Sequence, residues 1–354
     1  MNKLFSDLKV IELAGVLAGP SAGLFFAELG ANVIKIENPK TGGDVTRSWK
    51  LQSEDKNDKT SAYYWSINTG KEVLFLDLSI TSDLQQFYTL IKTADILITN
   101  YKLGDDLKLK VDYDTLKAIN PTLIYASING FGSNSARTAY DLILQAESGF
   151  MFMNGEKDAT PLKMPVALID ILAGHQLKEA ILIALINKYQ TQQGSHITVS
   201  LFDTAVASLA NQATNWLIAH HLPSAQGSLH PNIAPYGEIF TTKDNHQITF
   251  AIGSDKQFKQ LCIILNIEVT DEYQSNQLRI SNRQKLFEVL SKSIQTLNFD
   301  ILFNECLKHN VPIGKIRNLK EVFELPESKT LINSFNYGNN VVNSVKSISF
   351  KFES

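Results

Sequence analysis

The chain has 354 residues, of which 44% are hydrophobic and 19% are charged. This length and composition are typical of a globular protein with two domains or one large one. The formal net charge is only −3, so the chain lacks the broad basic surface of a nucleic-acid-binding protein. We therefore expect no nucleic acid as its main partner.

Cysteine usage and hydropathy indicate the compartment. Cys262 and Cys306 lie far apart and fit no metal or redox motif, which favours two core-filling thiols in a reducing environment. Met1–Asp7 contains no apolar leader. Residues 204–237 lack Asp, Glu, Lys and Arg, but Asn, Gln, His and Pro interrupt them. They predict no membrane span, and we expect a cytoplasmic protein without a membrane partner.

The first part of the chain alternates short apolar runs with helical patterns, which is typical of an α/β domain with a mostly parallel sheet. Strands are predicted over residues 8–13, 32–37, 73–78, 96–99 and 123–128, and helices over 19–29, 82–93 and 113–120. The longest helix is predicted over 169–189, and a strand over 196–201 and a helix over 203–220 follow it.

The composition changes near residue 221, where Leu-Pro-Ser-Ala-Gln-Gly-Ser predicts a linker. The pattern beyond the linker is α+β. It contains a hairpin from residues 237–240 and 246–252 and helices over 255–265, 282–296 and 300–310. Residues 321–354 return to short strands and loops.

Asp170 is the leading candidate for chemistry. The run Val166–Gly174 predicts an apolar strand that delivers this carboxylate to the first turn of the longest helix. Unpaired N–H groups and the partial positive charge of a helix N-terminus would position Asp170 and keep it ionised. Asp is also among the preferred N-cap residues, so an ordinary capping role explains the same segment.

The turn Ala14–Gly23 follows a predicted strand and opens a helix, as phosphate-binding turns do. Gly15, Gly19 and Gly23 do not form G-x-G-x-x-G, and no phosphate-loop motif follows, which argues against NAD and phosphate-loop sites. Pro20 and the small residues around it allow a ligand to approach the backbone. They equally allow tight packing of the helix against the strand.

Several sequence blocks follow one another in a fixed order along nearly the whole chain. They are Leu8–Ala14, Leu17–Pro20, Leu29–Pro39, Gly43–Arg47, Leu76–Leu78, Asn100–Lys102, Asn120–Gly132, Ala139–Asp141 and the segment that ends at Asp170, with later blocks at His230–Gly237 and Val311–Gly314. Together they resemble the class III coenzyme A transferases of the CaiB/BaiF type. This group includes formyl-CoA and carnitine-CoA transferases and the α-methylacyl-CoA racemases.

The resemblance implies a covalent role for Asp170. In these transferases the matching Asp attacks the thioester of an acyl-CoA donor and forms a mixed anhydride. The CoA thiolate then forms an aspartyl-CoA thioester, which an acceptor carboxylate opens. The resemblance also implies that Asp141 is a second active-site carboxylate, and a capping or ion-paired Asp fits this position equally. Acyl-CoA is then a substrate, and no tightly bound cofactor or metal is expected.

The resemblance further implies contacts with CoA, whose phosphates require cations and backbone N–H donors. The matching positions are the backbone of Val16, Leu17 and Ala18 and the side chains of Lys71, Asn100 and Tyr101, with Lys35, Lys102 and Arg137 as weaker candidates. A solvated surface charge is the competing interpretation for each lysine.

The residue before Asp141 separates CoA transfer from racemisation. A racemase removes and returns a proton beside the thioester carbonyl, and the racemases of this group carry His at the matching position. Here the residue is Tyr140, and a tyrosine hydroxyl, with an ordinary pKa near about 10, is a poor base at neutral pH. His175 follows Asp170 by about 140° of helix rotation, so it should face elsewhere.

The resemblance implies a Rossmann-like large domain from residues 1–221 and 321–354, a small α+β domain from 222–320, and an interlocked homodimer. Some positions depart from the pattern. Asn38 replaces a frequent Arg, Lys102-Leu103-Gly104 replaces Arg-Pro-Gly, and the chain ends at Ser354, before a closing segment found in many relatives. The sequence thus predicts a CoA-transferase acting on an acyl-CoA and a carboxylic acid. An acyl-CoA racemase or epimerase and an inactive CoA-binding protein are the alternatives.

Overall fold

The structure is a computed structural model that describes residues 4–337 and 340–351. It consists of two compact units. The first unit contains the chain up to Phe152, Leu162–Pro223 and the segment from Thr330 onward. The second contains Met153–Pro161 and Ser224–Lys329. The grouping of the short Met153–Pro161 loop with residues that follow the linker was not predicted from the sequence.

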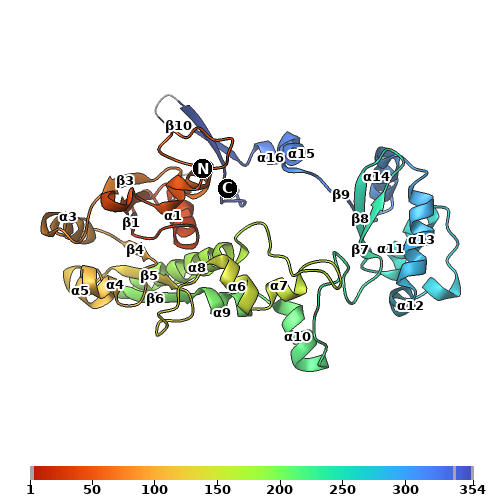
Figure 1. The fold of residues 1–354 in the computed structure, drawn as a ribbon, viewed down its shortest axis with the longest axis horizontal. Helices are drawn as coiled ribbons and strands as arrows, with labels where there is room; N and C mark the ends of the chain where they lie inside the picture. Colours follow the sequence, from red (N-terminus) through yellow and green to blue (C-terminus); the bar gives the residue numbers. More distant parts are fainter. Residues whose placement is uncertain (1–3, 338–339, 352–354) are drawn as a thin grey trace. The chain divides into compact units, whose positions relative to one another are not determined.

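A six-stranded sheet forms the frame of the first unit (Figure 1). Its strands are β1 (Lys9–Glu12), β2 (Asn32–Glu37), β3 (Glu72–Phe75), β4 (Ile96–Thr99), β5 (Ile124–Asn129) and β6 (Ser195–Ser200). They pair in the order β3-β2-β1-β4-β5-β6, and every pairing is parallel. This is the strand order of Rossmann folds, so the predicted α/β fold with a mostly parallel sheet is confirmed.

Helices cover both faces of this sheet. The helices of the first unit are α1 (Ala18–Glu28), α2 (Ala62–Asn68), α3 (Thr81–Ile91), α4 (Asp105–Leu109), α5 (Tyr113–Ile119), α6 (Asp141–Glu147), α7 (Phe150–Met153, which ends at the boundary), α8 (Leu168–Thr191), α9 (Leu201–Ala207) and α10 (Ala210–Ala219). Successive strand residues face opposite sides. Val10 and Ile98 therefore pack with α1 and α8, whereas Ile11 and Leu97 pack with α3 and α5.

The contact between α1 and α8 depends on a glycine. A Cβ atom at Gly174 of α8 would collide with Ser21 Oγ and lie 2.9 Å from the carbonyl oxygen of Ala18, both in the first turns of α1. Glycine therefore lets the two helices approach closely near their N-termini. The turn that opens α1 and the turn that opens α8 are brought together in this way.

The second unit is an antiparallel sheet with helices. Its strands β7 (Tyr236–Thr241), β8 (Gln247–Ala251) and β9 (Ile313–Lys315) pair in that order. Its helices are α11 (Asp255–Ile264), α12 (Asn276–Ser281), α13 (Arg283–Ile294), α14 (Phe299–Lys308), α15 (Leu319–Glu324) and α16 (Pro326–Lys329), drawn in blue shades in Figure 1. The predicted hairpin is confirmed as β7 and β8. No helix in the described ranges has both the length and the apolar character needed to cross a membrane.

Two sequence predictions are wrong. The segment before Asp170 forms no strand, because Pro165 has no N–H group for a ladder and the chain bends there before α8. The helix predicted over residues 203–220 is two helices, α9 and α10, and Ala210, the first residue of α10, has a positive φ of 49°.

The C-terminal segment forms a hairpin of β10 (Ile332–Tyr337) and β11 (Asn340–Val345). Phe335 and Tyr337 pack their rings on Trp65 of α2. Ser347 donates hydrogen bonds from its N–H and its hydroxyl to Glu28 at the end of α1. These contacts attach the end of the chain to the first unit.

Candidate active site

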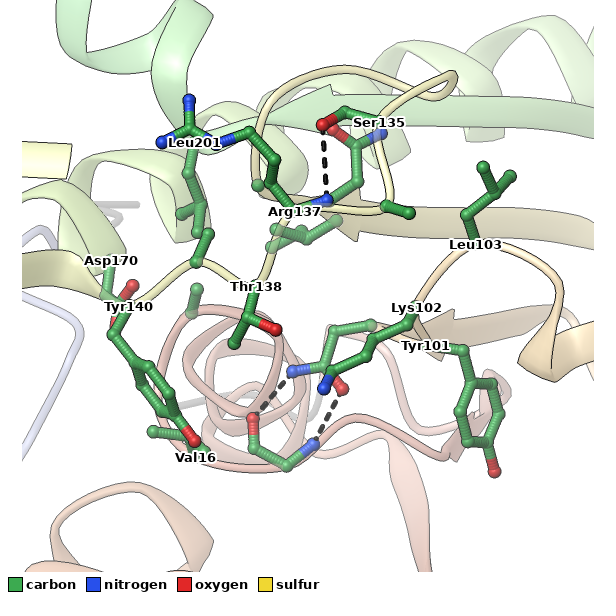
Figure 2. A pocket seen from close by; sticks show the side chains of 18 of the residues that line it. Val16, Tyr101, Lys102, Leu103, Ser135, Arg137, Thr138, Tyr140, Asp170 and Leu201 are labelled. Carbon is green, nitrogen blue, oxygen red and sulfur yellow. Dashed lines mark hydrogen bonds between the residues drawn. The ribbon is translucent and has the colours of Figure 1, made fainter. Parts of the chain in front are cut away.

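A cavity of about 190 Å³ lies at the carboxyl ends of β1, β4 and β5 (Figure 2). Chain connections leave the neighbouring strands β1 and β4 toward opposite halves of the sheet, so a crevice remains beyond their ends, and ligands bind there in Rossmann folds. The loops after these strands supply most of the lining. The cavity is lined by Gly15–Ala18, Asn100–Leu103, Ile128–Gly130, Ser135–Tyr140, Asp170 and Leu201.

The cavity collects most of the residues that the sequence singled out. Val16, Leu17, Ala18, Asn100, Tyr101, Arg137 and Asp170 all line it. In Figure 2, Asp170 and Tyr140 lie toward one side of the cavity, and Lys102 and Leu103 lie toward the other. Asp141, Lys71 and Lys35 are the predicted site residues outside this lining.

Asp170 is the third residue of α8 and only 8% exposed. None of the described residues donates a hydrogen bond to its carboxylate. Burial, together with the charge of Asp141, raises the pKa of Asp170 to about 7. Lost hydration and a neighbouring carboxylate therefore oppose the ionised form that the helix N-terminus would favour.

The capping interpretation of Asp170 is wrong, because Asp141 performs this role for α8. Asp141 Oδ1 accepts a hydrogen bond of 2.8 Å from the backbone N–H of Ile169. Gln145 Nε2 donates to Asp141 Oδ2 at 2.6 Å, and Gln145 Oε1 accepts from the N–H of Met164 at 2.8 Å. This network fixes the entry of the chain into α8 and, with it, the position of Asp170.

Lys71 is placed away from the cavity, with its side chain fully buried. Its ammonium lies 2.8 and 3.0 Å from the two carboxylate oxygens of Glu12 and also donates to the carbonyl of Pro20 and to Asn68 Oδ1. Burial lowers the pKa of Lys71 to about 8, against the opposing effect of Glu12. In this structure Lys71 is therefore a buried member of an ion-pair cluster, and its contact with CoA stays a prediction.

Lys35 belongs to the same buried cluster. Its ammonium lies 3.0 Å from both Glu12 and Asp44 and donates to the carbonyl of Ala14. Asp44 in turn accepts a hydrogen bond of 3.2 Å from the N–H of Val16, which has a positive φ of 70°. The cluster thus holds the loop behind the cavity. Sequence reasoning missed the role of Asp44, although its position two residues before Thr46 is a turn signal that could have found it.

Of the three predicted backbone donors, Val16, Leu17 and Ala18, two remain available, at the start of α1. Asn100 joins the loops after β1 and β4 by accepting from the N–H of Gly15 at 3.0 Å and donating to its carbonyl at 2.9 Å (dashed lines in Figure 2). The N–H of Val16 is already used by Asp44. Leu17 and Ala18 open α1, where N–H groups lack acceptors inside the helix.

Two cations and a phenol line the same cavity. Lys102 is exposed, and among the described residues it has no ion-pair partner. Arg137 forms a two-bond ion pair with Glu147 at 2.6 and 3.1 Å and stacks over the ring of Phe131. Burial raises the pKa of Tyr101 to about 12, so this hydroxyl stays a hydrogen-bond donor at neutral pH.

Histidines and metal ligands do not enter the site. His175 lines a different cavity from Asp170, which confirms that it faces elsewhere on α8. Within residues 4–337 and 340–351, no three His, Cys, Asp or Glu side chains gather in a way that could hold a metal ion.

Comparison with known proteins identifies the family. The family model described as CoA-transferase family III matches residues 5–349. The chain is 40% identical over 331 residues to a succinate–glutarate CoA-transferase of Agrobacterium fabrum, which covers 91% of this chain and 82% of that one. It is 34% identical over 334 residues to the succinyl-CoA:glutarate CoA-transferase of Homo sapiens, with 92% and 74% covered.

A solved structure agrees with this assignment. The crystal structure of a CaiB/BaiF family protein from Brucella suis superposes with a TM-score of 0.84 at 36% identity, covering 99% of this chain and 93% of that one. The family match extends over nearly the whole chain and includes the loops that line the cavity. The chain therefore belongs to CoA-transferase family III, the class III CoA-transferases.

Proposed function

We propose that this protein transfers CoA between carboxylic acids through covalent intermediates on Asp170. One observation carries the proposal: a carboxylate that is only 8% exposed, with no donor among the described residues, lines the cavity at the switch point of the sheet. A carboxylate without donors keeps its lone pairs available for attack. Burial also makes its charged form unfavourable, so conversion into a neutral anhydride or thioester removes an unfavourable charge.

The proposed reaction has four steps. An Asp170 oxygen attacks the thioester carbonyl of the donor, the C–S bond breaks, and a mixed anhydride and CoA thiolate result. The thiolate attacks the Asp170 carbonyl carbon and releases the donor acid, which leaves an aspartyl-CoA thioester. The acceptor carboxylate displaces the thiolate and forms a second anhydride. The thiolate then attacks the acceptor acyl carbon, and Asp170 leaves as a free carboxylate.

CoA is the substrate that the first cavity would hold. Leu17 and Ala18 offer N–H groups at the start of α1, where negative charge is favoured. Lys102 is available for a phosphate, and Arg137 would share its guanidinium between Glu147 and CoA. Asp141 acts in this scheme as a positioning residue, since it holds the first turn of α8.

Short dicarboxylic acids are the acids that we propose for the exchange. The two relatives described above are named for succinate and glutarate, and the cavities beside Asp170 have cations in their linings. We therefore expect succinyl-CoA or glutaryl-CoA as donor and the other acid as acceptor.

Intact-protein mass spectrometry with a panel of acyl-CoAs tests the covalent role. Wild-type protein is expected to gain the mass of an acyl group or of CoA, with peptide mapping that places the adduct on Asp170. Asp170→Ala, which removes the nucleophile, is expected to gain no mass. An adduct on another residue, or one that persists in the variant, would show that Asp170 is not the nucleophile.

The racemase alternative has its own readout. Incubation of an α-methyl acyl-CoA in deuterium oxide would place deuterium at the α-carbon if the protein removed that proton. We expect no exchange, because Tyr140 occupies the position of the base. Exchange without any covalent adduct would replace the transferase proposal with racemisation.

We also propose a homodimer. One side of α8 carries an exposed apolar strip, formed by Ile183, Ile186 and Tyr189, which are 68%, 60% and 76% exposed. Contact of such a strip with water is unfavourable. Sedimentation equilibrium is expected to give twice the chain mass, and the double variant Ile183→Asp, Ile186→Asp is expected to shift the mass toward the monomer. A wild-type protein that sediments as a monomer at micromolar concentration would refute the proposal.

A further inference from the structure

A second cavity, of about 780 Å³, adjoins the first. Leu17 lines both cavities. Asp141, Ala167 and Ile171 line the second, and Ile171 follows Asp170 directly in α8. The second cavity is therefore a neighbour of the nucleophile, although Asp170 itself is not part of its lining.

Lys178 of α8 is the unusual member of this lining. It is 8% exposed, and among the described residues no carboxylate or hydrogen-bond acceptor pairs with its ammonium. The ammonium lies 5.2 Å from the centre of the Phe25 ring. Glu179 and Glu28 act on Lys178 only from a distance. The Glu179 carboxylate accepts a hydrogen bond from Gln176, and that of Glu28 accepts hydrogen bonds from Ser347. A largely buried ammonium that no carboxylate contacts is unfavourable, so an anion in the cavity would be stabilised there.

Helix geometry relates this cation to the nucleophile. Lys178 follows Asp170 by eight positions, which corresponds to about 12 Å along the axis and about 80° of rotation. Side chains of a helix lean toward its N-terminus, so the long lysine side chain carries its ammonium back toward the first turn. Ile171 and Val166 also line the second cavity, and these apolar side chains suit a short methylene chain.

We infer that the second cavity binds the distal carboxylate of a short dicarboxylic acid, and that Lys178 holds it by an ion pair while the other carboxyl group exchanges at Asp170. The inference rests on the proposed function and deepens it, since it names the residue that would select dicarboxylic over monocarboxylic acids. Lys178 is then a specificity-determining residue whose charge acts on the tail of the acid and not on the reacting carboxyl group.

Succinate and butanoate form a matched pair of probes, because butanoate replaces only the distal carboxylate with a methyl group. Lys178→Met is expected to raise the KM for succinate about tenfold or more, as a lost charge-assisted hydrogen bond does, and to leave the KM for butanoate unchanged. Lys188→Met is the control, since this lysine lies on the same helix but pairs with Asp95 outside both cavities. It is expected to keep the wild-type ratio of the two KM values.

Calorimetric titration of the two acids onto the protein gives an answer that does not depend on turnover. Weaker succinate binding in Lys178→Met, with butanoate binding unchanged, would support the subsite even if no adduct formed on Asp170. The absence of an adduct would then count against the proposed covalent function and not against the subsite. Equal effects on both acids, or none on either, would refute the subsite. If Lys178→Met does not fold, Lys178→Gln removes the same charge and gives the same test.

Discussion

Replacing Asp170 with Asn is expected to lower turnover about 10⁴-fold or more and, at the same time, to stabilise the folded protein. Asn has nearly the same shape, so the capping network of Asp141 and Gln145 can remain in place. It offers no carboxylate to form an anhydride, which removes the covalent route. It also removes a charge from a site that is only 8% exposed and that faces another carboxylate.

The sign of the stability change follows from linkage. The pKa of Asp170 is about 7 in the folded protein, above the ordinary value of about 3.9 in an unfolded chain. The folded state therefore binds the proton more tightly, and wild-type stability falls as the pH rises from about 4 to about 7. Above pH 7 the full cost is present, and Asp170→Asn should be more stable than the wild type by about 2 kcal/mol or more.

Urea unfolding at pH 8 and at pH 5 measures this change, with a smaller advantage of Asp170→Asn expected at pH 5. The same pKa predicts that kcat/KM of the wild type rises about tenfold per pH unit below pH 7 and levels off above it. A flat profile between pH 5 and pH 8, or a variant less stable than the wild type at pH 8, would show that Asp170 is not the buried, titrating nucleophile.

Much of the fold could be predicted because the strands of the first unit are buried on both faces. Such strands are continuous apolar runs, and Val10, Ile11, Ile96, Leu97 and Ile98 are fully buried. The strand expected before Asp170 failed for a local reason, because Pro165 directly precedes an equally apolar run and the chain bends at Pro165 and Val166. An apolar run alone does not distinguish a strand from a bend that leads into a helix.

The candidate site could be predicted only in part, because the state of a charged side chain depends on partners far away in sequence. Lys71 pairs with Glu12, which lies 59 positions earlier, so the sequence cannot show that its ammonium is already used. Lys178 has the opposite character. It resembles any surface lysine of a long helix, and only packing reveals that it is 8% exposed.

Replacing Lys71 with Met is expected to destabilise the protein by about 3–5 kcal/mol without changing how the folded fraction binds acyl-CoA. The substitution leaves Glu12 buried with Lys35 as its remaining cation and removes the donor to Pro20 and Asn68. Chemical denaturation measures the loss, and the KM for acyl-CoA, determined where the variant is folded, measures the binding.

Two further variants separate a structural lysine from a ligand contact. Lys102→Met, at the exposed lysine of the cavity, is expected to give the reverse result, a raised KM for acyl-CoA with stability changed by less than about 0.5 kcal/mol. Adding Glu12→Gln to Lys71→Met removes both partners and leaves Lys35 paired with Asp44. The double variant should therefore recover part of the stability, because an unpaired buried charge costs more than a missing pair. If Lys71→Met instead raised the KM and left stability intact, Lys71 would have to leave Glu12 when CoA binds, and the buried cluster would be part of the binding site.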